Sequence, residues 1–124
     1  MYLNTVTLTG FIGADAVERT TKNNATFTTF SLATKNSWKD RESGEWQSRT
    51  EWHRAVVFGR LHEFAATLKK GDHVEIRGQL QTREYEGKDS VAKRVTEIRV
   101  FSILKLERSR KQNAAQPQLQ EVAA

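Results

Sequence analysis

Hydrophobic and polar positions alternate along most of this chain, and a period of two predicts β-strands. In the first such segment, Val6, Leu8 and Ile12 alternate with threonines. The pattern predicts five strands in all, at residues 5–12, Thr26–Lys35, Trp52–Phe58, His73–Arg83 and Val95–Leu106. Turn signals separate them at Asn23-Asn24 and at Glu86-Gly87-Lys88-Asp89. The polar stretch Asn36–Arg49 is interpreted as either a long loop or an extended hairpin.

The period changes once, between the third and fourth strands. Apolar residues then recur at the helical spacing i, i+3, i+4 and i+7, namely Leu61, Phe64, Ala65 and Leu68. Gly71 is the expected cap, and two lysines precede it, where they suit the negative end of the helix dipole. The sequence therefore predicts one short amphipathic helix over residues 61–68.

Three strands, one helix and two strands are the order of the OB-fold, an all-β five-stranded Greek-key barrel. Closing the sheet removes its exposed edges, and glycines such as Gly10, Gly13 and Gly78 suit the sharp bends of a small barrel. A β-sandwich stays open from the pattern alone. We expect one domain over residues 1–110, followed by a disordered Gln- and Ala-rich tail over residues 111–124.

Composition excludes several classes of function. The 124 residues contain no cysteine, which excludes disulfides, zinc–thiolate sites and a cysteine nucleophile. No phosphate-binding loop, nucleophile elbow or metal-binding histidine pair is present, so no enzyme, metal or cofactor is expected. No signal peptide or membrane-spanning segment is evident, and a soluble cytoplasmic protein is expected. The net charge is +5, concentrated in residues 99–111, and fits a polyanionic partner without proving one.

The aromatic residues are more informative than the charge. Trp38, Trp52 and Tyr85 lie among basic side chains and outside the apolar stripes. Aromatic rings give nucleobases a stacking surface, and interleaved lysines and arginines track phosphates. Trp52 and Phe58 could equally close the end of a barrel as core residues, and Trp46 favours neither interpretation. The pattern thus indicates a single-stranded nucleic-acid surface built from aromatic and basic side chains.

At these residues the sequence resembles bacterial single-stranded DNA-binding proteins. The matching blocks are Asn4–Gly10 with Ile12-Gly13, Phe30–Thr34, Ser37–Asp40, Thr50–Arg54, Phe58–Arg60, Lys70-Gly71 and Gly78–Arg83. They keep the order and approximate spacing of that family over residues 4–106.

The resemblance implies roles for individual residues. The stacking aromatics would be Trp38, Trp52, Phe58 and Tyr85, and the phosphate-contacting residues would be Lys39 or Arg41, Arg54, Arg60, Lys70 and Arg83. His53 would lie at a contact between protomers, which implies a homotetramer.

Two departures from the family pattern stand out. Glu84 lies beside Tyr85, where the family tends to be basic, and we expect weaker contact on that side. The chain also ends in Glu121-Val122-Ala123-Ala124, without the acidic tip and terminal Phe that recruit other proteins to typical members. This ending puts recruitment by that route in doubt.

The sequence therefore predicts a non-catalytic protein that binds and protects single-stranded DNA in replication, recombination and repair. Two alternatives stay open: a primosome-accessory OB-fold dimer, and a module whose aromatic residues contact a protein partner.

Overall fold

A computed structural model describes residues 1–106 and 118–121 of the chain. Its strands are β1 (Val6–Ile12), β2 (Val17–Thr20), β3 (Thr26–Lys39), β4 (Trp46–Val57), β5 (His73–Glu86), β6 (Ala92–Leu106) and β7 (Gln118–Glu121). One helix, α1 (Leu61–Ala65), lies between β4 and β5. The predicted all-β class with a short helix after the third long strand is confirmed.

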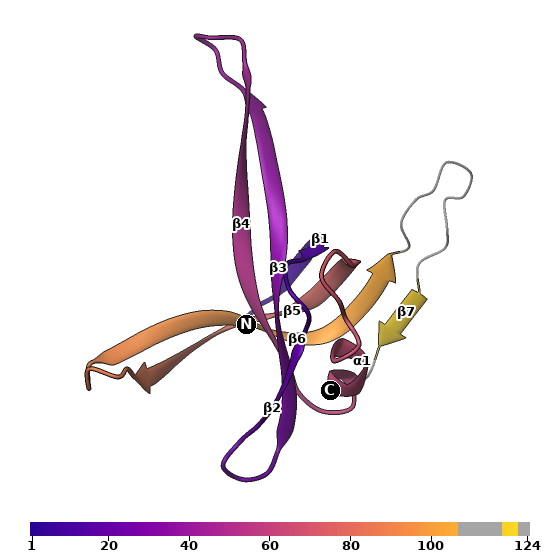
Figure 1. Ribbon diagram of the computed structural model, residues 1–124, viewed down its shortest axis with the longest axis vertical. Helices are drawn as coiled ribbons and strands as arrows, with labels where there is room; N and C mark the ends of the chain where they lie inside the picture. The colour runs from indigo at the N-terminus through magenta and orange to yellow at the C-terminus, as the bar shows by residue number, and fades with distance from the viewer. Residues whose placement is uncertain (107–117, 122–124) are drawn as a thin grey trace.

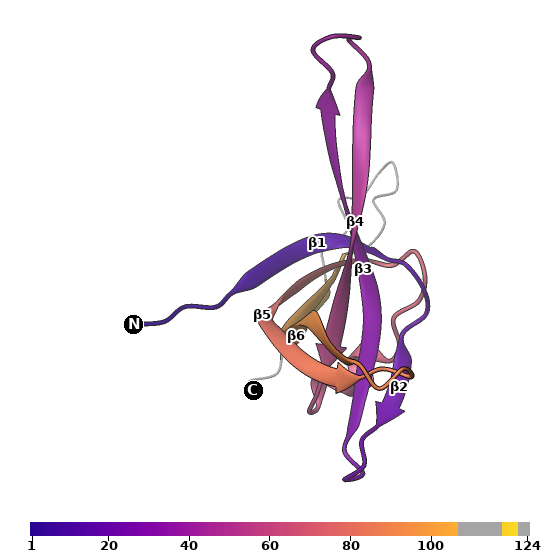
Figure 2. The ribbon, with the colours of Figure 1, turned by 90° about the vertical axis from the view of Figure 1, so that its left-hand side faces the viewer.

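Five strands close into a barrel (Figures 1 and 2). They follow the order β1-β5-β6-β4-β3, and β3 pairs back onto β1 through Phe11↔Ala33 and Ile12↔Leu32. These are the five strands that the alternation predicts. The closing pairing confirms the OB-fold barrel and removes the β-sandwich alternative.

Aliphatic side chains fill the barrel. The fully buried ones include Leu32, Val57, Val74, Ile76 and Ile103, which come from four of the five strands. The helix covers one end, where it buries Leu61 and Ala65 against the same cluster. The alternating pattern of the sequence therefore records which side chains point inward.

Two glycines allow the backbones of paired strands to approach closely. A Cβ atom at Gly10 would lie 2.0 Å from the carbonyl oxygen of Ala33, and one at Gly78 would lie 2.3 Å from that of Arg99. Gly78 also lies at the register shift between β5 and β6. Any larger residue would force the barrel open at these two places.

The helix is shorter than the predicted range of residues 61–68. It ends at Ala65, and Thr67 and Leu68 donate instead to the carbonyls three residues earlier. This tightened turn still buries Leu68, which explains why the helical spacing extended that far in the sequence. The prediction of Gly71 as helix cap is wrong, because the C-cap is Ala66; Gly71 lies in a later turn with φ of +90°.

Two hairpins extend beyond the barrel. Strands β3 and β4 pair as far as Lys39↔Trp46, and we name the ribbon from Lys35↔Thr50 to the turn at residues 40–45 the β3–β4 arm. It projects from the barrel as the long upright ribbon in Figure 1. The extended hairpin is thus the correct one of the two interpretations of Asn36–Arg49. Strands β5 and β6 form a second arm that ends at Glu86↔Ala92.

Two short strands were not predicted. Strand β2 pairs with β3 across a turn in which Asn24 has a φ of +64°, at the predicted Asn23-Asn24 turn. Strand β7 pairs antiparallel with β6. The predicted domain end at residue 110, and most of the predicted tail, lie outside the described residues. Within the described part of the chain, no helix is long and apolar enough to cross a bilayer.

Candidate nucleic-acid interface

Strand register gathers most of the candidate residues on one surface. Residues paired across neighbouring strands share a face of the sheet. We call the outer face the odd positions 29–39 of β3, the even positions 46–56 of β4, and the odd positions 79–85 of β5 and 93–99 of β6. Trp52, Arg54, Arg83 and Tyr85 all lie on it. The sequence alone could place each residue on a strand, but the parallel β4–β6 pairing is what unites them.

A buried glutamate holds two of the candidate arginines. Glu97 is only 6% exposed, and its two carboxylate oxygens accept hydrogen bonds from Arg54 Nε at 2.9 Å and Arg83 Nε at 2.8 Å. Both arginine side chains remain nearly half exposed. Charge-assisted bonds to one rigid acceptor fix the guanidinium groups and leave their outer nitrogens available to an incoming anion.

Trp52 lies next to Gly13 without being buried. Its side chain is 62% exposed, and a Cβ atom at Gly13 would lie 2.2 Å from its Cζ3 atom. Gly13 therefore provides the space in which the indole rests. The sequence left open whether Trp52 belongs to the core, and its exposure places it on the surface.

Phe58 has a different environment. It follows β4 directly and is half-buried. Its ring stacks on Phe27 with centroids 4.9 Å apart, and the guanidinium of Arg99 lies 4.8 Å from its centroid. Phe58 thus packs against another side chain of the barrel while part of it stays exposed, whereas Trp52 is mostly exposed.

On the second arm, Tyr85 lies beside a cation and away from the neighbouring acid. The guanidinium of Arg83 is 5.7 Å from the Tyr85 ring centroid, within cation–π range. Glu84 alternates to the opposite face, and its carboxylate lies 4.0 Å from Arg94 Nε. The predicted weakening of contact beside Tyr85 is therefore not supported by the position of Glu84.

The β3–β4 arm carries the remaining aromatic candidate. Trp38 is 45% exposed, but its pairing with Gln47 puts it on the face opposite to Trp52. Lys39 lies on the outer face and pairs with Trp46, and Arg41 lies in the turn at the end of the arm. The structure thus brings Lys39 to the surface of Trp52 and does not bring Trp38 there.

Three further candidates lie away from the outer face. Arg60 is the N-cap of α1, and Lys70 lies in the turn after it, where its backbone N–H donates to Asp15. His53 is half-buried on the opposite face of β4, and its Nε2 lies 2.8 Å from the Thr34 hydroxyl. These three residues do not join the group of Trp52, Arg54, Arg83 and Tyr85. Their positions still allow contacts with a ligand that extends beyond that group.

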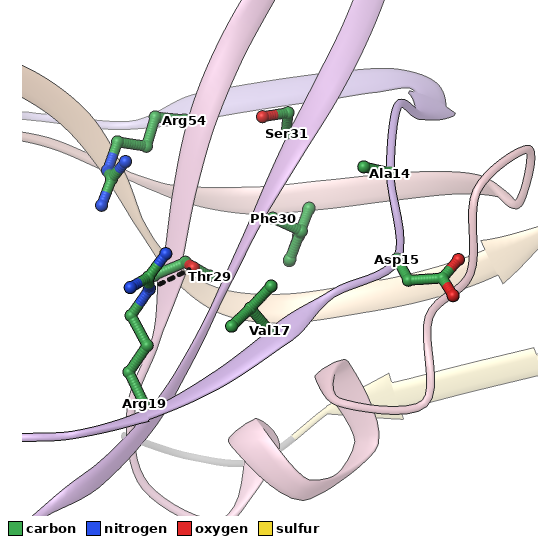
Figure 3. A pocket seen from close by; sticks show the side chains of 8 residues that line it. All are labelled: Ala14, Asp15, Val17, Arg19, Thr29, Phe30, Ser31 and Arg54. Carbon is green, nitrogen blue, oxygen red and sulfur yellow. Dashed lines mark hydrogen bonds between the residues drawn. The ribbon is translucent and has the colours of Figure 1, made fainter.

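A shallow pocket of about 150 Å³ lies beside Arg54 (Figure 3). Arg19 and Arg54 lie at one end and Asp15 at the other, with Phe30 and Val17 between them. Arg19 Nε donates to the Thr29 hydroxyl at 3.1 Å. Sequence reasoning missed Arg19 because it lies on β2, four exposed residues that carry no alternating pattern.

The electrostatic character of the outer face follows from its register. Its strand positions hold six cations, Lys35, Lys39, Arg54, Arg83, Lys93 and Arg99, and their one acid is Glu97. Exposed rings can stack nucleobases, and the cations among them can neutralise phosphates. Among the described residues, no group of His, Asp and Glu is arranged to hold a metal ion.

Comparison with known proteins agrees with this chemistry. The model of the single-strand binding protein family matches residues 3–106. A Plasmodium falciparum single-strand binding protein solved in complex with single-stranded DNA is 35% identical, with a TM-score of 0.69; the match covers 80% of this chain and 87% of that one. A deletion mutant of the Thermus aquaticus single-stranded DNA-binding protein is 29% identical, with a TM-score of 0.72. That match covers 86% of this chain and 51% of the Thermus chain, so this chain spans about half its length.

The different environments of Trp52 and Phe58 predict different effects on stability. Phe58→Ala removes a ring packed on Phe27 and should lower the free energy of unfolding by about 1–3 kcal/mol. Trp52→Ala removes an exposed ring and should change it by less than about 0.5 kcal/mol. Urea denaturation of both variants measures this, and equal losses would show that Trp52 is a core residue.

Proposed function

Because the chain belongs to the single-strand binding protein family, we propose that it coats single-stranded DNA with little sequence preference through its outer face. The observation that carries this proposal is the exposed Trp52 beside two arginines that Glu97 holds in place. Family members of this kind act by binding and not by catalysis. The protein protects exposed strands in replication, recombination and repair, and acts at the nucleoid in the cytoplasm.

Roles divide according to position. Trp52 and Tyr85 stack bases, while Arg54 and Arg83 neutralise the phosphates between them. Phe58 adds a further ring beside them, with the guanidinium of Arg99 4.8 Å from its centroid. The remaining candidates, Trp38, Lys39, Arg41, Arg60 and Lys70, contact the strand where it leaves this centre. Contacts that neutralise DNA phosphates or stack on bases do not depend on the hydrogen-bonding edges of the bases. Such contacts therefore give little sequence preference.

We further propose that the protein assembles as a homotetramer. Apolar side chains remain exposed on the barrel, including Phe11 at 51%, Leu80 at 50% and Phe101 at 40%. Burial of such residues between protomers would remove them from water. His53 joins this contact. Light scattering should give the mass of four chains, whereas a mass of two would favour the related primosome-accessory dimer.

The three tryptophans report binding directly, since all of them are exposed. Titration with an oligothymidine of about thirty nucleotides, longer than the 4–16 that one OB-fold covers, should quench their fluorescence strongly. Duplex of equal length should produce little change. Trp52→Ala should weaken binding by about 1–3 kcal/mol while the fold melts as before.

Two variants control this experiment. Gly13→Ala keeps the indole of Trp52 but displaces it from its position beside residue 13. This variant should therefore reproduce part of the loss of affinity seen for Trp52→Ala. Thr20→Ala changes an exposed residue of β2 that pairs with Thr26 and so lies off the outer face; it removes no ring or charge and should bind as the wild type does. Absence of quenching with the single strand at low salt would refute DNA binding and favour the protein-interaction module.

Salt dependence tests the arginines separately from the rings. On single strands, log affinity falls with log salt concentration by about 0.7 for each phosphate neutralised. Arg54→Ala should therefore make the slope shallower by about 0.7. Arg77→Ala, an exposed arginine outside the outer face, is the control and should leave the slope unchanged. Equal slopes for Arg54→Ala and wild type would remove Arg54 from the phosphate contacts.

A further inference from the structure

All three tryptophans of the chain lie on β3 and β4, and none is buried. Tryptophan is ordinarily among the more buried residue types, since its large ring gains most from leaving water. Trp46 is the most exposed of the three, at 73%. It lies on the β3–β4 arm, where residues 35–39 and 46–50 are all exposed and no barrel core exists for it to pack on. Packing of the fold therefore gives no reason for an indole at this position.

Register places Trp46 on the same face as Trp52. The two residues are six positions apart on β4, so both side chains point to the outer face, about 20 Å from one another at 3.3 Å per residue. Lys39 pairs directly with Trp46, and Lys35 pairs with Thr50 between the two rings. The arm thus repeats the combination of ring and cation that the barrel presents at Trp52 and Arg54.

The surface between the two rings is open and free of acids. The pair Ser37↔Ser48 and the residue Thr50 present only small hydroxyl groups there. The acid on this part of β4, Glu51, alternates to the opposite face and pairs with Arg49 at 2.8 Å. A strand lying on Trp52 therefore meets no bulky side chain or negative charge on its way to Trp46.

The turn at the end of the arm sets the limit of this surface. Asp40, Glu42 and Glu45 gather there, and only Arg41 opposes them. The Asp40 carboxylate accepts the backbone N–H of Glu42, which keeps that charge at the turn. These three carboxylates outnumber Arg41, so Trp46 and Lys39 form the last pairing of a ring and a cation along the outer face of the arm.

We propose that single-stranded DNA continues from the barrel along the outer face of the β3–β4 arm, where Trp46 stacks a base and Lys39 neutralises an adjacent phosphate. This inference rests on the proposed function and extends it to a residue to which the sequence pattern assigned no role. Trp38 lies on the other face of the arm, so it does not share this site.

Trp46→Ala in the full chain tests the proposal. Its affinity for an oligothymidine of about thirty nucleotides should fall by roughly fivefold or more, the equivalent of one lost base stack. Trp46→Phe keeps a ring and should retain most of the affinity. Gln47→Ala is the matched control, because it alters the adjacent exposed residue on the opposite face and should bind as the wild type does.

The outcomes separate this inference from the proposed function. If the wild type binds the oligonucleotide and Trp46→Ala binds equally well, the arm site is refuted and the barrel site stands. If the wild type does not bind, both are refuted.

A second measurement does not depend on affinity. In Trp38→Phe/Trp52→Phe, Trp46 is the sole tryptophan, and saturating oligothymidine should quench its emission. Unchanged emission at saturation would overturn the proposal, even if Trp46→Ala had lost affinity through a change in the shape of the arm.

Discussion

Closure of the barrel depends on how closely two backbones can approach. Strand β1 pairs with β5 along most of its length and with β3 at its end, and this double pairing turns a sheet into a barrel. The carbonyl oxygen of Ala33 occupies the space that a side chain at Gly10 would need. Gly78 allows a similar close approach between the paired strands β5 and β6, at their register shift. Without these two close approaches the sheet would not close into a barrel, and its inner face would not be separated from its outer face.

That separation determines the chemistry of the surface. Aliphatic residues and one phenylalanine, Phe30, fill the small interior, so the tryptophans remain outside. Glu97 is the exception to an outer face of cations and rings, and its burial under two arginines explains why it belongs there. Removal of a buried acid of this kind would leave two guanidinium groups unpaired and unordered. The same carboxylate thus pairs β4 with β5 through β6 and positions the two arginines that we propose contact DNA.

The sequence predicted the barrel well, because alternation follows burial and each of the five barrel strands buries one side. It did not predict β2, whose Val17–Thr20 are all exposed, nor the length of the β3–β4 arm, whose two faces both meet solvent. Trp52, Arg54, Arg83 and Tyr85 could be nominated from their types and from a family resemblance. The roles of Gly13 and Glu97 could not, since each depends on a partner far away in the chain, and Arg19 was missed because β2 carries no alternating pattern.

The two-stranded nature of the β3–β4 arm has a consequence for motion. Its amides are protected by one ladder of hydrogen bonds and by no buried face, whereas those of the barrel lie over a packed core. Isolated two-stranded ribbons are marginally stable in water. The arm therefore opens locally while the barrel stays intact, and its amide hydrogens exchange with solvent through those openings. A polymer bound across the β3–β4 arm and the barrel would hold the arm to the barrel. Hydrogen exchange in the arm would then slow, although the hydrogen bonds within the arm are unchanged.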